Sequence, residues 1–412
     1  MRVCVVGSGG REHALAHVLG RRHEVVVTPG NPAIPGSVPT PPEELEADLF
    51  VVGPEAPLVD GLADRLRDRG RVVFGPGADG ARLEGSKAWM KQVLADAEVP
   101  TARHASFTEP EPAIEYLRSL APPYVVKTDG LAAGKGVLVA EDLTDAEADV
   151  REKLAGRSFG AAGTTVVIEE GLVGPELSLL VVCNGTDAVP LAPAQDFKRI
   201  GDGDEGPNTG GMGAYSPVPS AGDDVVGLVM HRAVEPTLAA LRSAGIDYRG
   251  VLYAGLMLTA DGPKVIEYNV RFGDPEAQVV LPRLASDLGE LLLQAACGEA
   301  MDEPTFSDDA AVTVVLASEG YPESPRTGDV ITGLEEADAM DGVSVFAAGV
   351  GTDDQGRFVT AGGRVLAVTG TGPTLADARE LAYRAADGID WRGKQHRTDI
   401  AASAATTERT GA

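Results

Sequence analysis

The chain has 412 residues, long enough for two or three domains, and 43% of them are hydrophobic, as in folded globular proteins. Its 62 acidic residues outnumber 35 basic ones and give a formal net charge of −27, which argues against nucleic acid or an anionic membrane as a partner. No apolar stretch approaches the ~18 residues of a membrane span. The three cysteines are far apart and form neither a metal nor a disulfide pattern, so we expect a reducing, cytoplasmic location.

Residues 1–100 alternate β-rich runs with helical patterns. The runs "RVCVVG", "HEVVVTPG", "DLFVVGPE" and "RVVFGPG" predict buried strands, and residues 11–20 and 58–69 predict the helices between them. This alternation indicates a Rossmann-like α/β domain with a parallel sheet, in which ligands bind at the carboxyl ends of the strands.

Residues 101–307 have a different texture, because glycine-rich turns separate the predicted strands. Four strand-like runs at about 120–190, with a helix near 143–155, predict a small α+β lobe. The loop "RIGDGDEGPNTGGMGAY" that follows is dense in glycine and short of apolar anchors, which suggests mobility. A helix at 223–243 then leads to a hairpin with Asp261-Gly262 at its turn, and helices around 275–298 close the region.

Residues 308–412 predict a third, mostly β domain. Its strands are expected in "AVTVVLASEG", "SVFAAGV" and "RVLAVTG", followed by the helix "TLADARELAYRAADGI". The final residues, "ASAATTERTGA", are small and polar and predict a disordered tail.

The first glycine-rich loop, "VVGSGGREHA", joins a strand to a helix. Gly7 and Gly9 fit a dinucleotide fingerprint, but Glu12 stands where the third glycine belongs, and the second strand does not end in an acidic residue. Nicotinamide or flavin binding is therefore not expected. The amides of Gly9 and Gly10 at the helix start, with Arg11, could bind an anion. The alternative is a tight turn beside a solvated arginine.

The second loop, "KTDGLAAGKGV", differs from a Walker A loop. Only three residues separate Gly130 from Gly134-Lys135, and no serine or threonine follows the lysine to hold magnesium. Lys127 lies in an apolar strand, where a lysine usually meets an opposite charge. The loop could cover a triphosphate with its amides and Lys135, with the metal held elsewhere. The alternative is that Lys127 reaches solvent from an edge strand.

A metal site is predicted in "KVIEYNVRFGDPE". Glu267 and Asn269 are two residues apart on a strand and point to the same side, and a carboxylate with an amide oxygen suits magnesium. Arg271 follows on the same face. The alternative is an amphipathic strand with one wet face.

A nucleoside site is plausible in "VVIEEGLVGPELSLL". Glu169 and Glu170 end one predicted strand and Glu176 begins the next, so a carboxylate there could accept hydrogen bonds from ribose hydroxyls. Solvated glutamates at strand ends are the alternative.

Seven motifs, "GSGGREHAL", "GPEAPLVDGL", "LEGSKAWMK", "KTDGLAAGKGV", "GPNTGGMGAYSP", "EYNVRFGDPE" and "GGRVLAVT", occur in one order. This ordered set of motifs resembles that of the glycinamide ribonucleotide synthetase (phosphoribosylamine–glycine ligase) family of ATP-grasp enzymes. The resemblance extends from Met1 to about Ile400. The resemblance implies that residues 101–307 form a two-lobed ATP-grasp domain whose lid lobe is at about 120–190.

The resemblance also implies a reaction. ATP, glycine and 5-phosphoribosylamine would give glycinamide ribonucleotide, ADP and phosphate through glycyl phosphate, an early step of de novo purine synthesis. It implies magnesium or manganese as cofactor and a monomeric protein. The alternatives are another ATP-grasp carboxylate–amine ligase, or a non-catalytic nucleotide sensor, which should have lost the lysine and metal positions found here.

The resemblance assigns roles residue by residue. The implied catalytic residues are Arg271, Lys127, Asp196 and Lys198. The implied ATP contacts are Lys87, Lys127, Gly134, Lys135, Gly136, Glu169, Glu170, Leu172 and Glu176. The implied substrate contacts are Gly9, Gly10, Arg11, Gly53, Pro54, Glu55, Arg271 and Arg364, and the implied metal ligands are Glu267 and Asn269. One departure is Phe197, where the family usually has histidine, which argues against an essential acid or base there.

Overall fold

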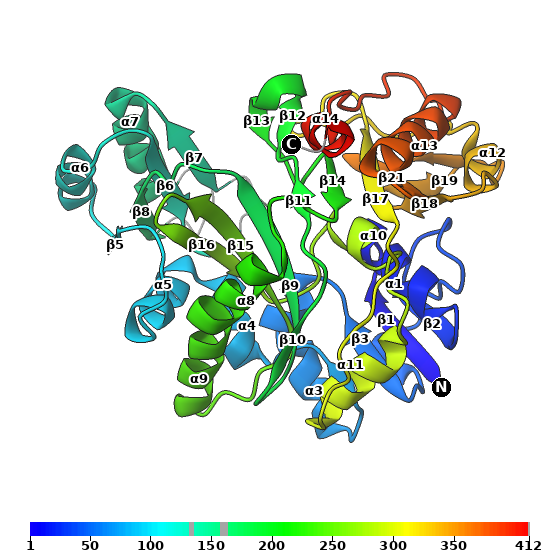
Figure 1. Cartoon of the computed structure of the whole chain (residues 1–412), viewed down its shortest axis with the longest axis horizontal. Helices are drawn as coiled ribbons and strands as arrows, with labels where there is room; N and C mark the ends of the chain where they lie inside the picture. Colours follow the sequence, from blue (N-terminus) through cyan, green and yellow to red (C-terminus); the bar gives the residue numbers. More distant parts are fainter. Residues whose placement is uncertain (132–135, 157–163, 411–412) are drawn as a thin grey trace.

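The N-terminal segment of this computed structural model, which describes residues 1–131, 136–156 and 164–410, is a parallel α/β layer (Figure 1). Its sheet has the order β2-β1-β3-β4, with β1 parallel to both β2 and β3, and this confirms the predicted Rossmann-like arrangement. The strands are β1 (Arg2–Gly7), β2 (Glu24–Pro29), β3 (Leu49–Val52) and β4 (Val73–Phe74). The helices are α1 (Gly10–Leu19), α2 (Glu55–Val59), α3 (Leu62–Asp68), α4 (Ala78–Gly85) and α5 (Lys87–Asp96), with a 3-10 turn at Pro42–Glu44.

The helix predicted at 58–69 is two helices. α2 ends at Val59 and α3 begins at Leu62, because Gly61 between them has φ of 75°, a left-handed conformation that breaks a helix and that glycine adopts without strain.

A small lobe, residues 104–170, projects from the rest of the molecule at the upper left of Figure 1. Its antiparallel sheet has the order β5-β8-β6-β7, and helices α6 and α7 pack on it. The elements are β5 (His104–Phe107), α6 (Pro110–Arg118), β6 (Tyr124–Thr128), β7 (Val137–Ala140), α7 (Leu143–Leu154) and β8 (Val166–Glu170). Ile114, Leu117 and Val126 belong to a hydrophobic core of this lobe that is separate from the main core.

The central sheet is antiparallel with the order β10-β9-β15-β16. Its strands are β9 (Glu176–Asn184), β10 (Ala188–Pro190), β15 (Arg249–Thr259) and β16 (Gly262–Asn269). β9 was expected in the lobe at about 120–190, but it pairs along its length with β15, so the boundary between the lobes falls after β8. The predicted hairpin is confirmed, because Thr259 pairs with Gly262 across the Asp261 turn.

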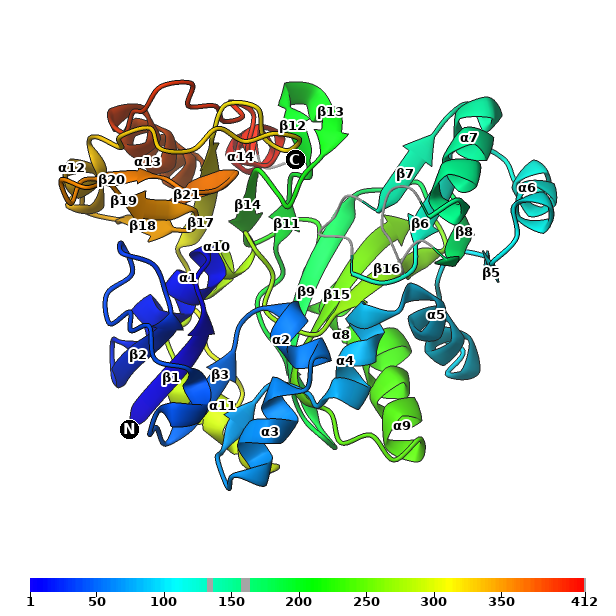
Figure 2. The same ribbon diagram turned by 180° about the vertical axis from the view of Figure 1, so that it is seen from behind.

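Several helices lie between and after the strands of the central sheet. The helix predicted at 223–243 consists of α8 (Asp223–Val229), a π-helical turn (Met230–Val234) and α9 (Glu235–Ser243). The helices expected around 275–298 are α10 (Ala277–Val280) and α11 (Leu288–Cys297). Figure 2 shows α8 and α9 beside β15 and β16, and α10 between the N-terminal and C-terminal sheets.

The C-terminal sheet contains two strands from the middle of the chain. Its order is β11-β14-β17-β21-β18, and β14 pairs with β17 from Gly213↔Val314 to Ser216↔Ala311. The strands are β11 (Gln195–Asp196), β14 (Gly213–Ser216), β17 (Ala310–Ala317), β18 (Val343–Ala347) and β21 (Arg364–Gly372), and β19 (Val350–Thr352) pairs with β20 (Phe358–Thr360). Helix α13 (Leu375–Gly388) packs on β21 and β17, and α12 (Leu334–Asp338) packs on β18.

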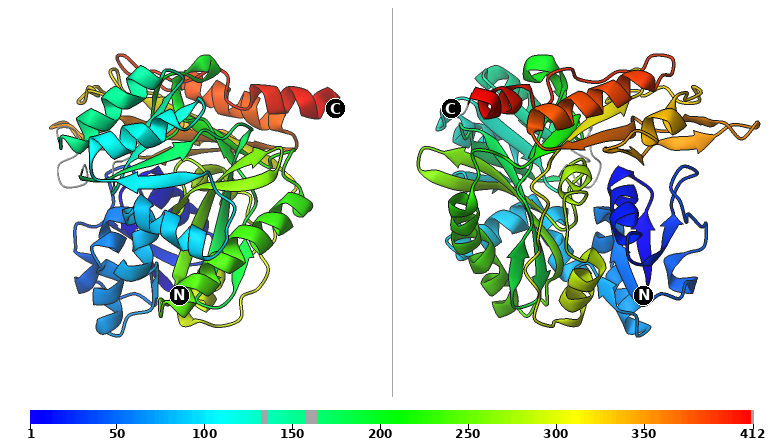
Figure 3. Two further views of the ribbon diagram at one scale, coloured as in Figure 1. Left: turned by 90° about the vertical axis from the view of Figure 1, so that its left-hand side faces the viewer. Right: turned by 45° about the vertical axis from the view of Figure 1, so that its right-hand side comes forward.

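The predicted disordered tail is wrong over its described part, because Ala402–Thr410 form helix α14. Ala405 is buried, and the Leu375 amide donates to Glu408 at 2.8 Å, so the tail packs on α13 (Figure 3). Composition suggested disorder, but a partner helix supplies the contacts that a short polar helix cannot provide for itself.

The glycine-rich loop at 199–215, expected to be mobile, instead contains the hairpin β12 (Arg199–Gly201) and β13 (Glu205–Asn208). Its anchors come from far along the chain. The Arg397 guanidinium, 1% exposed, contacts Asp204 at 2.7 Å and donates to the Arg199 carbonyl at 3.2 Å, and Asp399 accepts from the Gly203 amide at 2.9 Å. Polar contacts therefore order a segment that lacks apolar anchors.

One large hydrophobic core joins the N-terminal, central and C-terminal sheets. The right-hand view of Figure 3 shows the C-terminal sheet lying above the N-terminal layer, with the central elements beside both. Among the described residues, no helix combines the length and apolar character needed to cross a bilayer.

Candidate active site

Lys127, on β6 of the small lobe, meets the central sheet. Its ammonium lies 3.0 Å from Glu169 Oε1 and donates to the Ile266 carbonyl at 3.1 Å, and the residue is 3% exposed. Ile266 directly precedes Glu267 on β16. The lysine predicted to bind phosphate and the predicted metal ligands therefore lie next to one another across the boundary between the lobes.

Glu169 is buried between two lysines. Besides Lys127, its other oxygen lies 2.9 Å from the Lys91 ammonium. Burial raises the pKa of Glu169, but Lys127 and Lys91 lower it by more, so its pKa is below the ordinary value. The carboxylate predicted near the nucleoside is thus committed to lysines, and only its backbone could contact a base. Lys91 was missed by the sequence analysis.

The base of the predicted phosphate loop is fixed to the start of α5. The Lys87 ammonium donates to the Gly130 carbonyl at 2.9 Å, and Asp129 accepts from Ser86 Oγ and the Ala88 amide, both at 3.2 Å. Burial lowers the pKa of Lys87. Gly136 closes the other side of the loop, because its carbonyl accepts from the Thr128 amide at 2.8 Å. The predicted ATP contacts Gly134 and Lys135 lie outside the described residues.

Glu267 and Asn269 stand on the same face of β16, as predicted. Burial raises the pKa of Glu267, but Lys127, Lys198 and Lys87 lower it, with a net decrease that keeps the carboxylate ionised. The pair offers hard oxygen donors that fit a divalent cation. Among the described residues no group of three or more His, Cys, Asp or Glu side chains could hold a metal by itself.

The segment between β8 and β9 carries the other predicted nucleotide contacts. Glu170 accepts from the Arg103 amide at 3.0 Å, and Leu172 is partly buried in the connection to β9. Glu176, at the start of β9, lies 2.6 Å from the Lys198 ammonium. The ribose contact expected of Glu176 would therefore have to share this carboxylate with a lysine.

Asp196 and Lys198 form a close ion pair. The Lys198 ammonium lies 2.7 Å from Asp196, whose side chain is 6% exposed. Burial raises the pKa of Asp196 to about 7, with Glu276 and Glu176 adding to the increase and Lys198 opposing it. Burial lowers the pKa of Lys198, but Asp196 and Glu176 raise it well above its ordinary value. Lys198 therefore stays charged while Asp196 can change its protonation near neutral pH.

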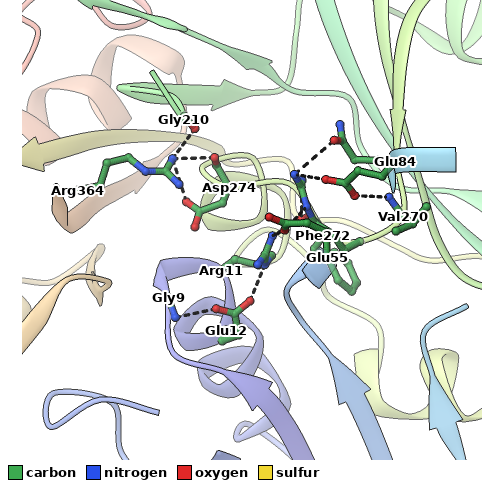
Figure 4. A network of polar contacts seen from close by, with 12 residues as sticks. Gly9, Arg11, Glu12, Glu55, Glu84, Gly210, Val270, Phe272, Asp274 and Arg364 are labelled. Atoms are coloured by element: carbon green, nitrogen blue, oxygen red, sulfur yellow. Dashed lines mark hydrogen bonds and ion pairs between the residues drawn. The ribbon is translucent and has the colours of Figure 1, made fainter. Parts of the chain in front are cut away.

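Arg271, two residues after the end of β16, connects the central sheet to the N-terminal layer through Glu84 and Glu55, which Figure 4 labels. It lies 2.9 Å from Glu84 and 3.3 Å from Glu55, and it donates to Asn269 Oδ1 at 3.3 Å. Burial lowers the pKa of Arg271, but Glu84 and Glu55 raise it, with a net increase. The guanidinium was expected to be available for a substrate carboxylate, but in this conformation two protein carboxylates use it.

Arg11 and Glu12 fill the predicted anion site at the start of α1. The Gly9 amide donates to Glu12 Oε2 at 2.7 Å, so this amide is not free for a ligand, contrary to the prediction. Arg11 lies 2.5 Å from Glu12, donates to the Phe272 carbonyl at 3.2 Å and lies 3.9 Å from Glu55 (Figure 4). Arg11 therefore faces the same carboxylate as Arg271, so the two cations lie close together.

The remaining predicted substrate contacts surround this cluster. A Cβ on Gly53 would approach Glu12 Oε1 to 2.2 Å, so glycine is required there, and Pro54 caps α2, which begins at Glu55. A Cβ on Gly10 would approach the buried Gln278 amide nitrogen to 2.8 Å.

Arg364 brings the C-terminal sheet into the site. It donates to the Asp274 carbonyl at 2.8 Å and lies 3.4 Å from the Asp274 carboxylate, and it also contacts the Gly210 carbonyl (Figure 4). Burial raises the pKa of Asp274, but Arg364 and Arg11 lower it, and the net effect is a decrease. Arg11, Arg271 and Arg364 thus come together from three distant parts of the chain.

Sequence reasoning missed several residues of this site. Four of them contact a predicted site residue with a charged side chain: Glu12, Glu84, Lys91 and Asp274. The fifth, Glu276, lies close enough to Asp196 to raise its pKa. The signal was present for some of them, since Glu84 and Lys91 flank Lys87 in "LEGSKAWMK", and Asp274 and Glu276 belong to "RFGDPE". The motifs are recognised by their glycines and lysines, whereas these five residues hold the predicted site residues in position.

Family models match most of the chain. The phosphoribosylglycinamide synthetase N domain matches residues 1–84, the ATP-grasp (A) domain of that family matches 85–277, and its C domain matches 311–403. The phosphoribosylamine–glycine ligase of Streptomyces coelicolor is 50% identical, over 98% of this chain and 100% of the relative.

Solved structures agree with this match. The Thermotoga maritima phosphoribosylamine–glycine ligase has a TM-score of 0.86 and 37% identity, over 97% of this chain and 100% of that one. The biotin carboxylase domain of Hydrogenobacter thermophilus 2-oxoglutarate carboxylase has a TM-score of 0.71 over 96% of this chain and 91% of that one, but at 15% identity it shows a shared fold alone. With three family domains matched in order, the chain belongs to the phosphoribosylglycinamide synthetase family of ATP-grasp proteins.

Proposed function

We propose that this protein catalyses the ATP-dependent ligation of glycine to 5-phosphoribosylamine, giving glycinamide ribonucleotide, ADP and phosphate in purine biosynthesis. The observation that carries the proposal is the position of Lys127. It reaches from the small lobe to the backbone beside Glu267 on the central sheet, next to an arginine cluster drawn from all three family domains. The relatives named phosphoribosylamine–glycine ligase support the choice of substrates.

The first step transfers the γ-phosphoryl group of ATP to the glycine carboxylate. The bond from the γ-phosphorus to the bridging oxygen breaks, ADP leaves, and a carboxylate oxygen gains the phosphoryl group as glycyl phosphate. Lys127 and Lys87 would neutralise charge on the phosphates, which is the main protein contribution in phosphoryl transfer. Glu170 and Leu172, in the connection between the lobes, are the proposed neighbours of the base.

The second step forms the amide bond. The amine of 5-phosphoribosylamine attacks the carbonyl carbon, the bond to the phosphate oxygen breaks, and the nitrogen loses a proton. Asp196, with its pKa of about 7, is the proposed acceptor of that proton, and Lys198 beside it would stabilise the anionic phosphate as it leaves. Arg11 and Arg364 are the proposed contacts of the anionic sugar phosphate.

Glu267 and Asn269 are the proposed ligands of a magnesium or manganese ion. Such an ion would supply positive charge to the phosphates and orient them. The 2-oxoglutarate carboxylase domain that shares this fold was solved with magnesium ADP. We also propose that the protein acts as a monomer, as we expect from the family resemblance, and in the cytoplasm, as we expect from its cysteine pattern. Its net charge of −27 argues against nucleic acid or membrane partners.

The test is ADP release by the purified protein. We expect release only when ATP, glycine and 5-phosphoribosylamine are present together. Lys127→Met should lower kcat/KM by on the order of 10²–10³-fold, the loss typical of one preorganised electrostatic group. Lys264→Met, on the same strand as Glu267 but paired with Asp261 at the hairpin turn at 3.9 Å, should keep full activity. ADP release without 5-phosphoribosylamine, or none under any condition, would refute the proposal.

A further inference from the structure

Lys91 belongs to a buried polar chain that joins the small lobe to the central sheet. Its ammonium donates to Glu169 Oε2 at 2.9 Å and to Thr101 Oγ1 at 2.7 Å. Thr101 in turn donates to the Val265 carbonyl on β16 at 2.6 Å. Lys91 therefore contacts the small lobe and, through Thr101, the central sheet.

The chain carries an uneven charge. Lys91 and Lys127 share the single carboxylate of Glu169, one on each oxygen at 2.9 and 3.0 Å. All three side chains are almost fully buried, at 1%, 4% and 3% exposure for Lys91, Lys127 and Glu169. Burying a charge is costly unless an opposite charge meets it. Glu267, whose pKa Lys127 lowers, supplies part of the opposite charge, and with a divalent cation bound to Glu267 the trio would favour a further anion.

Lys91 cannot act on a ligand directly. Its ammonium is held by Glu169 and Thr101 inside the protein, whereas Lys127 is the lysine that reaches β16 beside Glu267. Burial lowers the pKa of Lys91 to about 8, while Glu169 raises it and Lys127 lowers it. The lysine is thus still charged at neutral pH, where it can neutralise Glu169.

We infer that Lys91 is a positioning residue that neutralises Glu169, so that the Lys127 ammonium keeps an unbalanced positive charge for a nucleotide phosphate. Without Lys91, Glu169 and Lys127 would form a neutral pair and Lys127 would be drawn away from an anion. The inference deepens the proposed function and rests on it, since the anion is the phosphate chain of ATP. It explains why the second lysine of "SKAWMK" is buried rather than exposed to the substrates.

The experiment is a charge-balance cycle on the full chain, with binding measured by isothermal titration calorimetry. The probes are ADP with magnesium, and adenosine, which lacks phosphate. Lys91→Met should weaken ADP binding roughly tenfold or more, because Lys127 would lose its charge-assisted hydrogen bond to phosphate. The same variant should leave adenosine binding unchanged. The double variant Lys91→Met/Glu169→Gln restores the net charge and should bind ADP within about threefold of the parent protein.

A matched control removes another buried lysine from the small lobe. Lys153, on α7, is 4% exposed and pairs with Asp149, and Lys153→Met should not change ADP or adenosine binding. In steady-state assays, Lys91→Met should raise the KM for ATP and leave the KM for glycine unchanged.

The results of these experiments distinguish failure of the inference about Lys91 from failure of the proposed function. Unchanged ADP binding in Lys91→Met would overturn the inference, and so would a double variant that stays as weak as Lys91→Met, because a purely structural role would not be rescued by restoring the charge. Failure of the unaltered protein to bind ADP would refute the proposed function, and the inference with it.

Discussion

Asp196 illustrates how one residue acquires its chemistry from its neighbours. An aspartate in water loses its proton at a pH far below neutral. Burial raises the pKa of Asp196 to about 7, although Lys198, at 2.7 Å, lowers it. Glu176 also contacts Lys198, at 2.6 Å, so the lysine keeps one partner when Asp196 is protonated. The pair can therefore gain or lose a proton while Lys198 keeps an acidic partner.

The activity should follow the ionisation of Asp196. An acid with a pKa of about 7 loses its proton as the pH rises, so kcat/KM should fall about tenfold per unit below pH 7 and level off above it. Asp196→Asn should be slow and independent of pH over the same range. The measurement is a pH–rate profile of ADP release for both proteins, and an unchanged profile in Asp196→Asn would rule out this role.

The β12–β13 hairpin depends on distant residues for its order, as Asp196 depends on its neighbours for its pKa. Its residues have little intrinsic preference for strand, and Gly203 at its turn has φ of 68°. Order comes from Arg397, which bridges Asp204 and Asp399 and lies over the Phe197 ring at 4.9 Å. Because Phe197 lies between Asp196 and Lys198, this contact also holds the segment that carries these two residues. Phe197 thus has a packing role, as the partner of the Arg397 guanidinium.

Removing the Arg397 anchor should loosen the hairpin and displace the neighbouring Asp196–Lys198 pair, to which we assign the proton transfer. In Arg397→Met, we expect faster hydrogen exchange at residues 199–208 and a kcat/KM about tenfold lower, with the KM for ATP unchanged. Arg384→Met is the control, because that exposed arginine contacts only Glu380 among the ion pairs of the described residues, at 3.9 Å. Equal exchange in the two variants would show that Arg397 does not order the hairpin.

The described residues of the molecule form two separate hydrophobic cores. The large core unites the N-terminal, central and C-terminal sheets, whereas the small lobe packs around its own cluster, which includes Leu117 and Val126. Contacts between the small lobe and the remainder include the polar chain through Lys91, Glu169 and Lys127. Separate cores joined by polar contacts allow the small lobe to unfold or shift without disrupting the large core.

A cavity in the small lobe should therefore destabilise that lobe alone. Leu117 is fully buried, and Leu117→Ala should cost the lobe about 3 kcal/mol. Hydrogen exchange should rise across residues 104–131, 136–156 and 164–170 while β1 and β3 stay protected. Leu66→Ala, fully buried in the large core, should instead weaken protection in the N-terminal sheet. Loss of protection throughout the chain in both variants would mean that the two cores unfold as one unit.

The order of secondary structure and the motif positions could be predicted from the sequence, because they depend on local patterns. The apolar runs of β1 and β3, the Asp261-Gly262 turn and the shared face of Glu267 and Asn269 follow from spacing along a few residues. The family resemblance also needed only the motifs and their order.

Contacts between distant segments could not be predicted in this way. Neither the entry of β14 into the C-terminal sheet nor the anchoring of residues 199–208 by Arg397 leaves a local signal, since each depends on partners about a hundred or more residues away. Nothing in the local sequence around Lys91, Glu84 and Glu12 indicated that these charges would be buried against other charged groups. Whether a charge is solvated, paired or free for a ligand depends on burial and on the opposite charge brought beside it, and only the folded chain determines both.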